Sequence, residues 1–236
     1  MTEKSWQERT IRLIGVEATA RLAASRVLII GLGGVGGFAA EHLARCGVGH
    51  LTLVDGDTVD VTNCNRQLAA LHSSVGRFKV AVLAERFRDI NPEIEVAERP
   101  VFLRSAADFD ALDAEQFDLV IDAIDEVNAK VELIEWARRH RLPLISSMGA
   151  AGKFDASAIR IADISKTCGC PLARAVRRRL RERHIDRGVA VVFSPEAAQP
   201  GPNGDKPGSL SYLVAAFGAV CAQAAISRLL SLPTDR

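Results

Sequence analysis

The sequence predicts an α/β fold, with a Rossmann-like, mostly parallel sheet, helices on both faces and an extended C-terminal half. The first indication is residues 26–30 (RVLII), a continuous apolar run of the kind found in strands buried on both faces of a parallel sheet. The second is the glycine-rich segment GLGGVG at residues 31–36, which follows that run directly. The third is the alternation of further strand-like and helix-like segments down the chain.

The other elements are expected in chain order. A helix over residues 37–46 and a strand over 50–55 complete a βαβ unit after the glycine turn. A helix over 76–91 is predicted because apolar residues recur there at helical spacing, and Pro92 ends it. Further strands are predicted over residues 94–101, 117–124, 143–147, 159–164 and 189–194, with a helix over 126–141.

The composition is that of an ordinary soluble protein, with 48% apolar and 25% charged residues. The five cysteines are irregularly spaced, and the polar N-terminus has no apolar core of a secretory signal, so we expect a cytoplasmic protein. Residues 209–227 carry no charge and approach the length of a membrane span. Because serine, glutamine and alanine dilute that segment, we interpret it as a buried interface helix, with membrane association as the alternative.

The glycine turn predicts an adenine-nucleotide site. Gly31, Gly33, Gly34 and Gly36 lie between a strand and a helix, where glycines let phosphate oxygens approach backbone N–H groups at a helix N-terminus. Asp55 ends the next strand, where a carboxylate can accept hydrogen bonds from ribose hydroxyls. Both NAD and ATP fit these features.

Polar residues further along favour ATP with Mg²⁺ over NAD. A triphosphate carries about four negative charges and is held by cations and a metal, which Arg66, Lys79 and a carboxylate could supply. Asp122 and Asp125 (DAID) follow an apolar strand, at the sheet edge where ligands bind. The alternative is that the cations are surface charges and the aspartates cap the next helix. The candidate nucleotide-binding residues beyond the glycine turn and Asp55 are Asp57, Asn63, Asn65, Arg66, Gln67, Lys79 and Asp122.

Four segments in this order, GLGGVG, VDGDTVDVTNCNRQ, GRFKV and DAID, resemble the MoeB/ThiF/HesA group, which activates ubiquitin and bacterial sulfur-carrier proteins. The likeness covers residues 9–150. It implies that Gly33 and Gly34 face the nucleotide and Asp55 the ribose. It also implies that Asn65, Arg66 and Lys79 contact phosphates, that Asp125 is the carboxylate on the Mg²⁺ side, and that Arg9 reaches the ATP of the other subunit in a homodimer. Glu126 stands where the group often has asparagine.

The second half resembles the tRNA threonylcarbamoyladenosine dehydratase branch of that superfamily, through SSMGAAGKFD, ISKTCGCPLARAVRRRLRERHI, VVFSPE and GSLSYLVAAFGAV. The resemblance implies that the threonyl carboxylate of the modified adenosine is adenylated. The neighbouring carbamoyl group then closes onto the activated carbonyl and expels AMP. One water is lost overall at the expense of ATP.

Two other functions remain open from the sequence. One is adenylation of a ubiquitin-like sulfur carrier, and the other is NAD binding by a non-catalytic regulator. Sulfur-carrier adenylators typically hold zinc with paired Cys-x-x-Cys motifs, and this chain has none. Cys168-Gly-Cys170 is the only close pair, so neither a zinc site nor a catalytic cysteine is expected there.

An arginine-rich helix suggests contact with tRNA. Leu172, Val176 and Leu180 form an apolar stripe at helical spacing. One row of cations on the opposite face suits a phosphate backbone; a solvated surface is the alternative. The candidate tRNA-binding residues are Arg174, Arg177, Arg178 and Arg181.

The chain is interpreted as a single domain, 1–236. Residues 26–150 form its ATP-binding part and 151–236 its substrate and dimerisation part. Residues 195–208 (PEAAQPGPNGDKPG) are rich in proline and glycine and are expected to form a loop over the site. A sulfur-transfer protein is a further possible partner.

Overall fold

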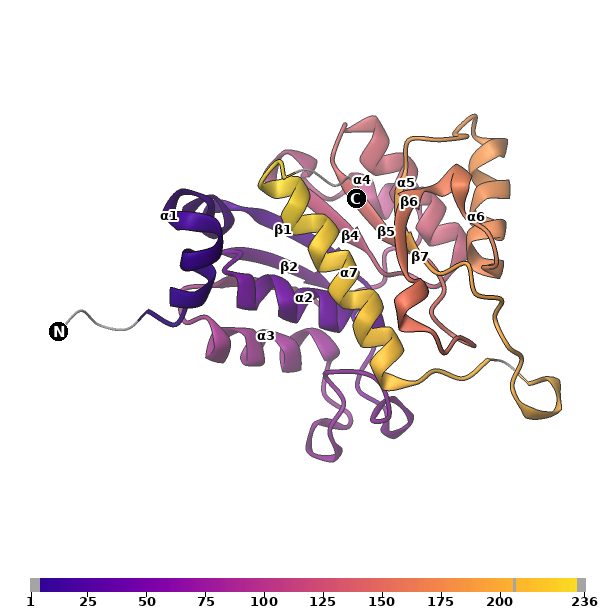
Figure 1. The fold of residues 1–236 in the computed structure, drawn as a ribbon, viewed down its shortest axis with the longest axis horizontal. Coiled ribbons are helices and arrows are strands. Elements are labelled where there is room, and N and C mark those ends of the chain that lie inside the picture. The colour runs from indigo at the N-terminus through magenta and orange to yellow at the C-terminus, as the bar shows by residue number, and fades with distance from the viewer. Residues whose placement is uncertain (1–4, 206, 233–236) are drawn as a thin grey trace.

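The computed structural model describes residues 5–205 and 207–232. Its centre is a seven-stranded sheet in the order β3-β2-β1-β4-β5-β7-β6 (Figure 1). All neighbouring strands are parallel except β6, which runs antiparallel to β7. The strands are β1 (Arg26–Ile30), β2 (His50–Val54), β3 (Glu95–Arg99), β4 (Leu119–Asp122), β5 (Leu144–Ser147), β6 (Arg160–Asp163) and β7 (Ala190–Phe193). The predicted mostly parallel α/β sheet is confirmed.

Helices cover both faces of this sheet. They are α1 (Glu8–Ala24), α2 (Gly34–Cys46), α3 (Lys79–Ile90), α4 (Ala106–Asp110), α5 (Val127–Arg139), α6 (Pro171–Glu182) and α7 (Ser211–Leu229). Single turns of 3-10 helix occur at Val61–Asn63, His72–Ser74, Ala114–Gln116, Ala156–Ala158, Ile164–Lys166 and Pro202–Gly204. In Figure 1, α1 and α6 lie at opposite ends of the molecule, and α7 crosses the sheet diagonally.

Alternate residues of the central strand point into two different core layers. Val27 and Ile29 belong to the cluster that includes side chains of α2, α3 and α7. Leu28 and Ile30 instead join Trp136 of α5 on the opposite face. Because β1 is buried on both faces, it needs an uninterrupted apolar sequence, which the run at residues 26–30 provides.

The apolar segment near the C-terminus forms α7, a helix long and apolar enough to cross a membrane by length and composition, with a mean hydropathy of 1.5. Its buried face packs along α2. A side chain at Gly218 would lie 2.7 Å from the Val35 carbonyl oxygen, so the glycine allows close helix contact. This packing agrees with the interpretation of a buried helix.

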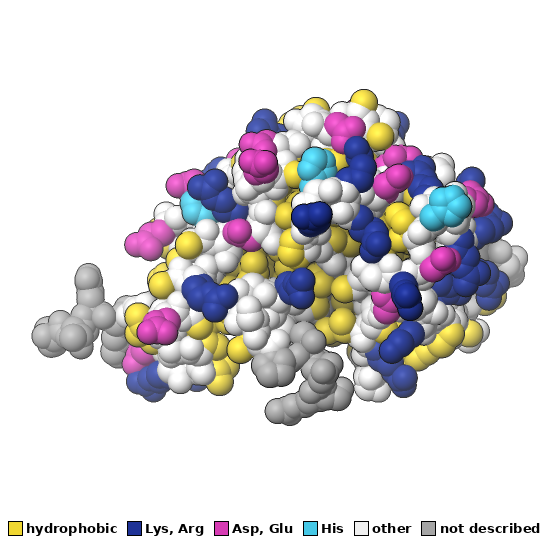
Figure 2. All heavy atoms as spheres, turned by 90° about the horizontal axis from the view of Figure 1, so that it is seen from above, with side chains coloured by type: hydrophobic (Ala, Val, Ile, Leu, Met, Phe, Trp, Pro, Cys, Tyr) yellow, Lys and Arg dark blue, Asp and Glu magenta, His cyan; other side chains and the backbone are white. Residues whose placement is uncertain are grey.

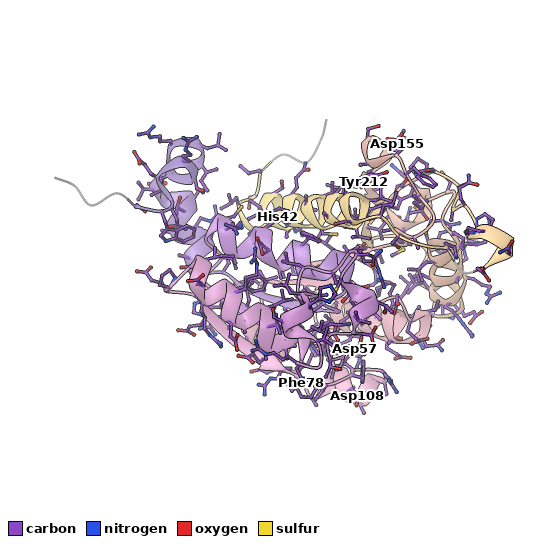
Figure 3. All side chains as sticks on the ribbon, turned by 90° about the horizontal axis from the view of Figure 1, so that it is seen from below. His42, Asp57, Phe78, Asp108, Asp155 and Tyr212 are labelled. Carbon is purple, nitrogen blue, oxygen red and sulfur yellow. The ribbon has the colours of Figure 1, made fainter. Side chains whose placement is uncertain are left out.

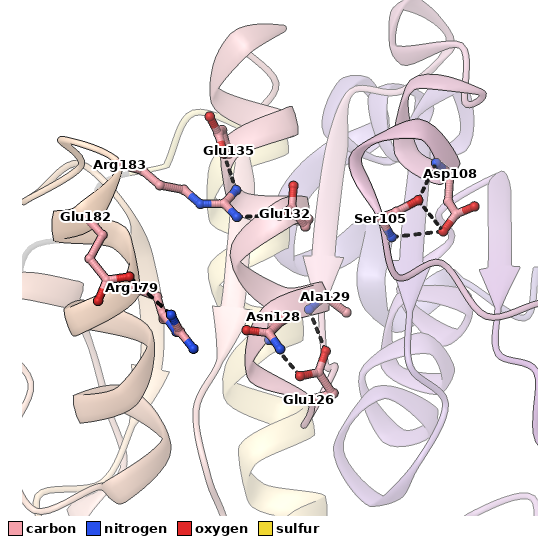
Figure 4. Close-up of polar contacts among 10 residues, drawn as sticks. All are labelled: Ser105, Asp108, Glu126, Asn128, Ala129, Glu132, Glu135, Arg179, Glu182 and Arg183. Atoms are coloured by element: carbon pink, nitrogen blue, oxygen red, sulfur yellow. Dashed lines mark hydrogen bonds and ion pairs between the residues drawn. The ribbon is translucent and has the colours of Figure 1, made fainter.

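Two helices were not predicted from the sequence. In α1, Gly15 has a φ of 83° and interrupts the helix. Apolar residues therefore do not recur at one continuous helical spacing along this segment, and that spacing is the signal from which a helix is predicted. The five-residue α4 is too short to show periodicity, but Ser105 and Asp108 cap it reciprocally (Figure 4). The strand predicted over 94–101 is shorter, at Glu95–Arg99.

Candidate active site

The glycine turn is shaped by contacts that leave no room for side chains. Gly31 has a φ of 88°, and a Cβ on it would lie 2.7 Å from the Ala123 carbonyl oxygen. A Cβ on Gly36 would lie 1.8 Å from the Gly31 carbonyl oxygen, so α2 approaches the end of β1 closely only because this residue is glycine. The turn therefore presents the N-terminus of α2 towards the space above the sheet.

That space is a cavity of about 1020 Å³ at the carboxyl ends of the parallel strands. Ligands bind at this edge in open α/β sheets. Predicted site residues that line the cavity are Gly31, Gly33, Gly34, Asp55, Asp57, Arg66, Gln67, Lys79 and Asp125. The structure thus brings together residues that are up to 94 positions apart in the sequence, from Gly31 to Asp125.

Asp55 organises the turn as well as facing the cavity. Its carboxylate accepts hydrogen bonds from the backbone N–H of Leu32 (2.6 Å) and of Asp57 (2.8 Å). Two backbone donors hold the carboxylate in a fixed orientation, which is what hydrogen bonding to a ribose requires. Gln67 is a second acceptor: its buried Oε1 has no hydrogen-bond partner within the described residues.

Two cations are held in place beside the glycine turn. The Lys79 ammonium pairs with Asp57, with 2.8 Å between Nζ and Oδ2, and only 4% of Lys79 is exposed. Arg66 donates to the Thr62 carbonyl oxygen (2.9 Å) and to Asn65 Oδ1 (2.8 Å). Such preorganised cations suit the charge of a polyphosphate.

Five predicted site residues do not line the cavity. Gly36 packs α2 against β1, and Asn63 accepts from the Asp60 backbone N–H in a helix cap. Asn65 donates to the Ser209 carbonyl oxygen (3.2 Å), joining the motif to the start of α7, and it orients Arg66. Arg9 is exposed on α1.

The fifth, Asp122, is placed differently from its predicted role at the nucleotide. It is fully buried, and its Oδ2 accepts from Lys130 Nζ (2.8 Å) and Ser146 Oγ (2.6 Å). The reason is the pleat of the strand: Asp122 is the last residue of β4 and points beneath the cavity, whereas Asp125 lies beyond the strand on the exposed loop.

The helix cap expected from an aspartate is provided by Glu126. Its carboxylate accepts from the backbone N–H of Asn128 (2.8 Å) and Ala129 (2.6 Å) at the start of α5 (Figure 4). Asp125 is therefore not needed as a cap. It faces the cavity as an exposed carboxylate with no side-chain partner in the described part of the chain.

Asp125 fits a Mg²⁺ site, because Mg²⁺ binds to one or two carboxylates together with substrate phosphates and water. The described residues hold no cluster of three or more His, Cys, Asp or Glu side chains that could bind a metal without a substrate.

Sequence reasoning missed much of the cavity wall. Phe102 and Arg104 lie in the loop after β3, with the Arg104 guanidinium 4.7 Å from the centre of the Phe102 ring. Gly149, Ala150 and Ala151 follow β5. The loop after β3 carries no recognisable motif, and residues 149–151, within SSMGAAGKFD, entered the sequence analysis through a resemblance and not as site residues. The rule that ligands meet the carboxyl ends of parallel strands would have identified both.

The arginine helix α6 is exposed on one face, as predicted. Arg174 and Arg178 are exposed, and Arg181 is 3.8 Å from Asp186. Arg177 differs from the prediction of a free cation: it is half-buried and donates to the carbonyl and hydroxyl oxygens of Thr167. Figure 2 shows many Lys and Arg side chains at the right-hand end of the molecule, where α6 lies in Figure 1.

The cysteines do not suggest a nucleophile at the cavity. None of the five lines it, and Cys170 is buried as the cap of α6. Burial raises the pKa of the Cys221 thiol to about 12. The exposed Cys168 is outside the cavity wall.

Comparison with known proteins gives a consistent result. A family model described as the ThiF family matches residues 7–236. The tRNA threonylcarbamoyladenosine dehydratase of Bacillus subtilis is 48% identical over 189 residues, covering 78% of this chain and 72% of that protein.

A crystal structure of the E. coli tRNA N6-threonylcarbamoyladenosine dehydratase TcdA with AMP superposes with a TM-score of 0.91 at 38% identity. It covers 98% of this chain and 97% of its own. The same enzyme has been crystallised with ATP. An adenylyltransferase and sulfurtransferase from Zea mays is 36% identical but matches only 58% of this chain and 28% of its own length.

Proposed function

This chain belongs to the ThiF family, and we propose that it acts there as an ATP-dependent tRNA threonylcarbamoyladenosine dehydratase. The observation that carries this proposal is the near-complete structural match to TcdA, an enzyme crystallised with both ATP and AMP. The cavity supports it independently. A glycine turn, two fixed cations and the exposed carboxylate of Asp125 meet at the carboxyl ends of the strands.

Different residues contact different parts of the nucleotide. Backbone N–H groups around Gly33 and Gly34 face the phosphates, and Asp55 accepts from the ribose hydroxyls. Arg66 and Lys79 neutralise the phosphate charge that builds up when pyrophosphate leaves. Both are already held by neighbouring acceptors, so little reorganisation is needed when ATP binds.

Asp125 would hold Mg²⁺ together with the phosphates, and the metal would add positive charge beside the leaving pyrophosphate. Arg9 would complete the site from a second subunit, since its exposed position on α1 lies outside the cavity of its own chain. The proposal therefore includes a homodimer.

The reaction needs positioning rather than an enzyme nucleophile. An oxygen of the threonyl carboxylate attacks the α-phosphorus of ATP, and pyrophosphate leaves. The carbamoyl group then closes onto the activated carbonyl and AMP leaves, so that one water is lost from the nucleoside overall. Because the reacting groups both belong to the substrate, holding them close to the nucleotide is the main contribution of the protein.

The exposed arginines of α6 supply the contact with tRNA. Arg174 and Arg178 have no side-chain acceptor in the described part of the chain, which leaves both free for phosphates. We also propose a cytoplasmic location, where the cysteines stay as free thiols. A sulfur-transfer protein as a partner remains a prediction.

The test is nucleoside mass analysis after incubation with ATP, Mg²⁺ and threonylcarbamoylated tRNA. The expected product is lighter by one water, and its formation should release AMP and pyrophosphate. Arg66→Ala should slow its formation by about 10²–10³-fold, whereas Arg77→Ala, outside the cavity, should leave the rate unchanged. Pyrophosphate exchange that requires a ubiquitin-like carrier and ignores tRNA would instead indicate a carrier adenylator and overturn the proposal.

A further inference from the structure

The cavity has two sides with different chemistry. The charged side is lined by residues that follow β2, β3 and β4: Asp55, Asp57, Arg66, Lys79, Arg104, Asp125 and Glu126. The other side is lined by Met148, Gly149, Ala150, Ala151, Leu172, Pro207 and Ser209. None of these described residues is charged, and we call this second side the uncharged wall.

The cavity is large for a ligand site. Pockets that hold a single drug-sized ligand have volumes of about 300–1,000 Å³. At about 1020 Å³ the cavity is at the top of that range. With the nucleotide on the charged side, the space beside the uncharged wall remains for a second reactant.

Hydrogen bonds from two chain segments fix the uncharged wall. Gly152 N–H donates to the Gly208 carbonyl oxygen (2.8 Å), and Gln199 N–H donates to the Gly152 carbonyl oxygen (2.6 Å). The carboxylate of Glu196 accepts from the backbone N–H of Phe154 and of Asp155, both at 3.0 Å. Glu196, Gln199 and Gly208 of this loop are therefore tied to the residues that follow the wall.

Lys153 reinforces this connection. It is 2% exposed, and its Nζ donates to the carbonyl oxygens of Ser194 (3.0 Å) and Glu196. On the α7 side, the Tyr212 hydroxyl donates to the Phe154 carbonyl oxygen (2.8 Å). Asp57 on the charged side and Tyr212 lie well apart in Figure 3. The uncharged wall is thus held in place by hydrogen bonds within the protein.

The same wall is continuous with the arginine helix. Leu172 lies in the first turn of α6 and lines the cavity, and Arg174 follows two residues later on the exposed face. Arg178 is one turn further along. A substrate that enters the cavity beside Leu172 and keeps its phosphates outside would contact the apolar Leu172 side chain with one part and the exposed arginines with the other.

We propose that the uncharged wall is the acceptor subsite for the modified adenosine, with Ala151 and Leu172 touching the nucleoside. Arg174 and Arg178 hold the phosphates that flank it in the tRNA. The small residues at 149–151 leave room for a planar base and its substituent, and the neutral wall avoids a charge near the carboxylate that must react. This inference rests on the proposed function and adds to it the residues that select the acceptor.

The first experiment blocks the subsite. Ala151→Leu should raise the KM for both threonylcarbamoylated tRNA and the isolated threonylcarbamoyladenosine nucleoside by at least about tenfold, since a misplaced side chain of this size opposes binding directly. The Kd for ATP should be unchanged. Ala107→Leu is the matched control, because Ala107 is exposed on α4 and outside the cavity.

The second experiment separates the phosphate contacts from the nucleoside contacts. Arg174→Gln with Arg178→Gln should raise the KM for tRNA and leave that for the nucleoside unchanged. The slope of log KM against log salt concentration should fall by about 1.5, because each phosphate contact contributes roughly 0.7–0.9. Equal effects on tRNA and nucleoside would contradict the assignment of these arginines.

The outcomes distinguish the two proposals. If the wild-type protein dehydrates the tRNA but folded Ala151→Leu keeps the wild-type KM for both substrates, the acceptor subsite is wrong and the dehydratase stands. If the wild-type protein makes no dehydrated product, both are wrong. Should Ala151→Leu melt below the wild type, Ala151→Val offers a smaller obstruction, and an unchanged nucleoside KM in that folded variant would also reject the subsite.

Discussion

Lys130 and Asp122 form an ion pair beneath the nucleotide cavity, with 2.8 Å between Nζ and Oδ2 and neither side chain exposed. Ser146 donates to the same carboxylate oxygen, and the other oxygen accepts from the Ile124 backbone N–H (3.0 Å). The pair therefore joins α5, β4 and β5, and it fixes the start of the loop that carries Asp125 into the cavity. A buried pair of this kind is costly to break because removing one member leaves the other charge buried without its counter-ion.

Lys130→Met should lower the free energy of unfolding by about 3–5 kcal/mol, because it leaves the Asp122 carboxylate buried without a cation. The double variant Lys130→Met with Asp122→Leu should recover a large part of that loss, since it removes both charges. Urea denaturation measures both, with Lys166→Met as the exposed control. A loss below about 1 kcal/mol in the single variant would contradict the importance of the pair.

Arg66→Ala should slow adenylation by about 10²–10³-fold, the usual effect of removing one preorganised group that stabilises transition-state charge. Among the described residues its guanidinium bonds to Thr62 and Asn65 alone, so the melting temperature should change little. AMP release in the presence of modified tRNA is the measurement. An unchanged rate would contradict the assignment of Arg66 to the phosphates of ATP.

Arg177→Ala and Arg178→Ala should have different effects although the residues are adjacent. Arg177 holds Thr167 through two oxygens, so its loss should lower stability by about 1–3 kcal/mol. Arg178 is exposed, so its loss should leave stability unchanged and weaken tRNA binding with a reduced salt dependence. Thermal unfolding and filter binding at several salt concentrations test this pair. Equal effects of the two variants on stability and on tRNA binding would contradict the different roles of Arg177 and Arg178.

The attachment of α6 to α5 should depend on pH. The Arg183 guanidinium hydrogen-bonds to Glu132 and Glu135 (Figure 4), and its bond to Glu132 lowers the pKa of that carboxyl below its ordinary 4.5. A lowered folded-state pKa gives stability that is present above pH 4.5 and is lost as the pH falls through the folded-state value.

Glu132→Gln should therefore be less stable than the wild type at pH 7, by about 0.5–1 kcal/mol for this partly exposed pair. The difference should shrink below pH 4.5. Urea denaturation at pH 7 and pH 4 gives both values. A difference that grows on acidification would show that another interaction of Glu132 dominates.

The sequence alone was enough to predict the parallel sheet and the glycine turn, because a continuous apolar strand must be buried on both faces and glycines between a strand and a helix leave room for phosphate oxygens. The sequence favoured ATP over NAD only through the cations and carboxylates further along, because the glycine turn fits both. It also identified Asp55, Arg66, Lys79 and Asp125, whose residue types suit a triphosphate and which all line the cavity.

Only the tertiary structure decided which of two neighbouring aspartates faces the cavity, which arginines of α6 are free, and what forms the uncharged wall. Asp122 and Asp125 differ in environment because one ends a strand and the other lies on the loop beyond it. Arg177 and Arg178 differ because Thr167 lies beside one of them. Residues 149–151 become part of a cavity wall only when the fold brings Leu172 and Pro207 beside them. Such differences arise from contacts between distant segments, and a linear sequence does not specify the direction in which each side chain points once those segments pack.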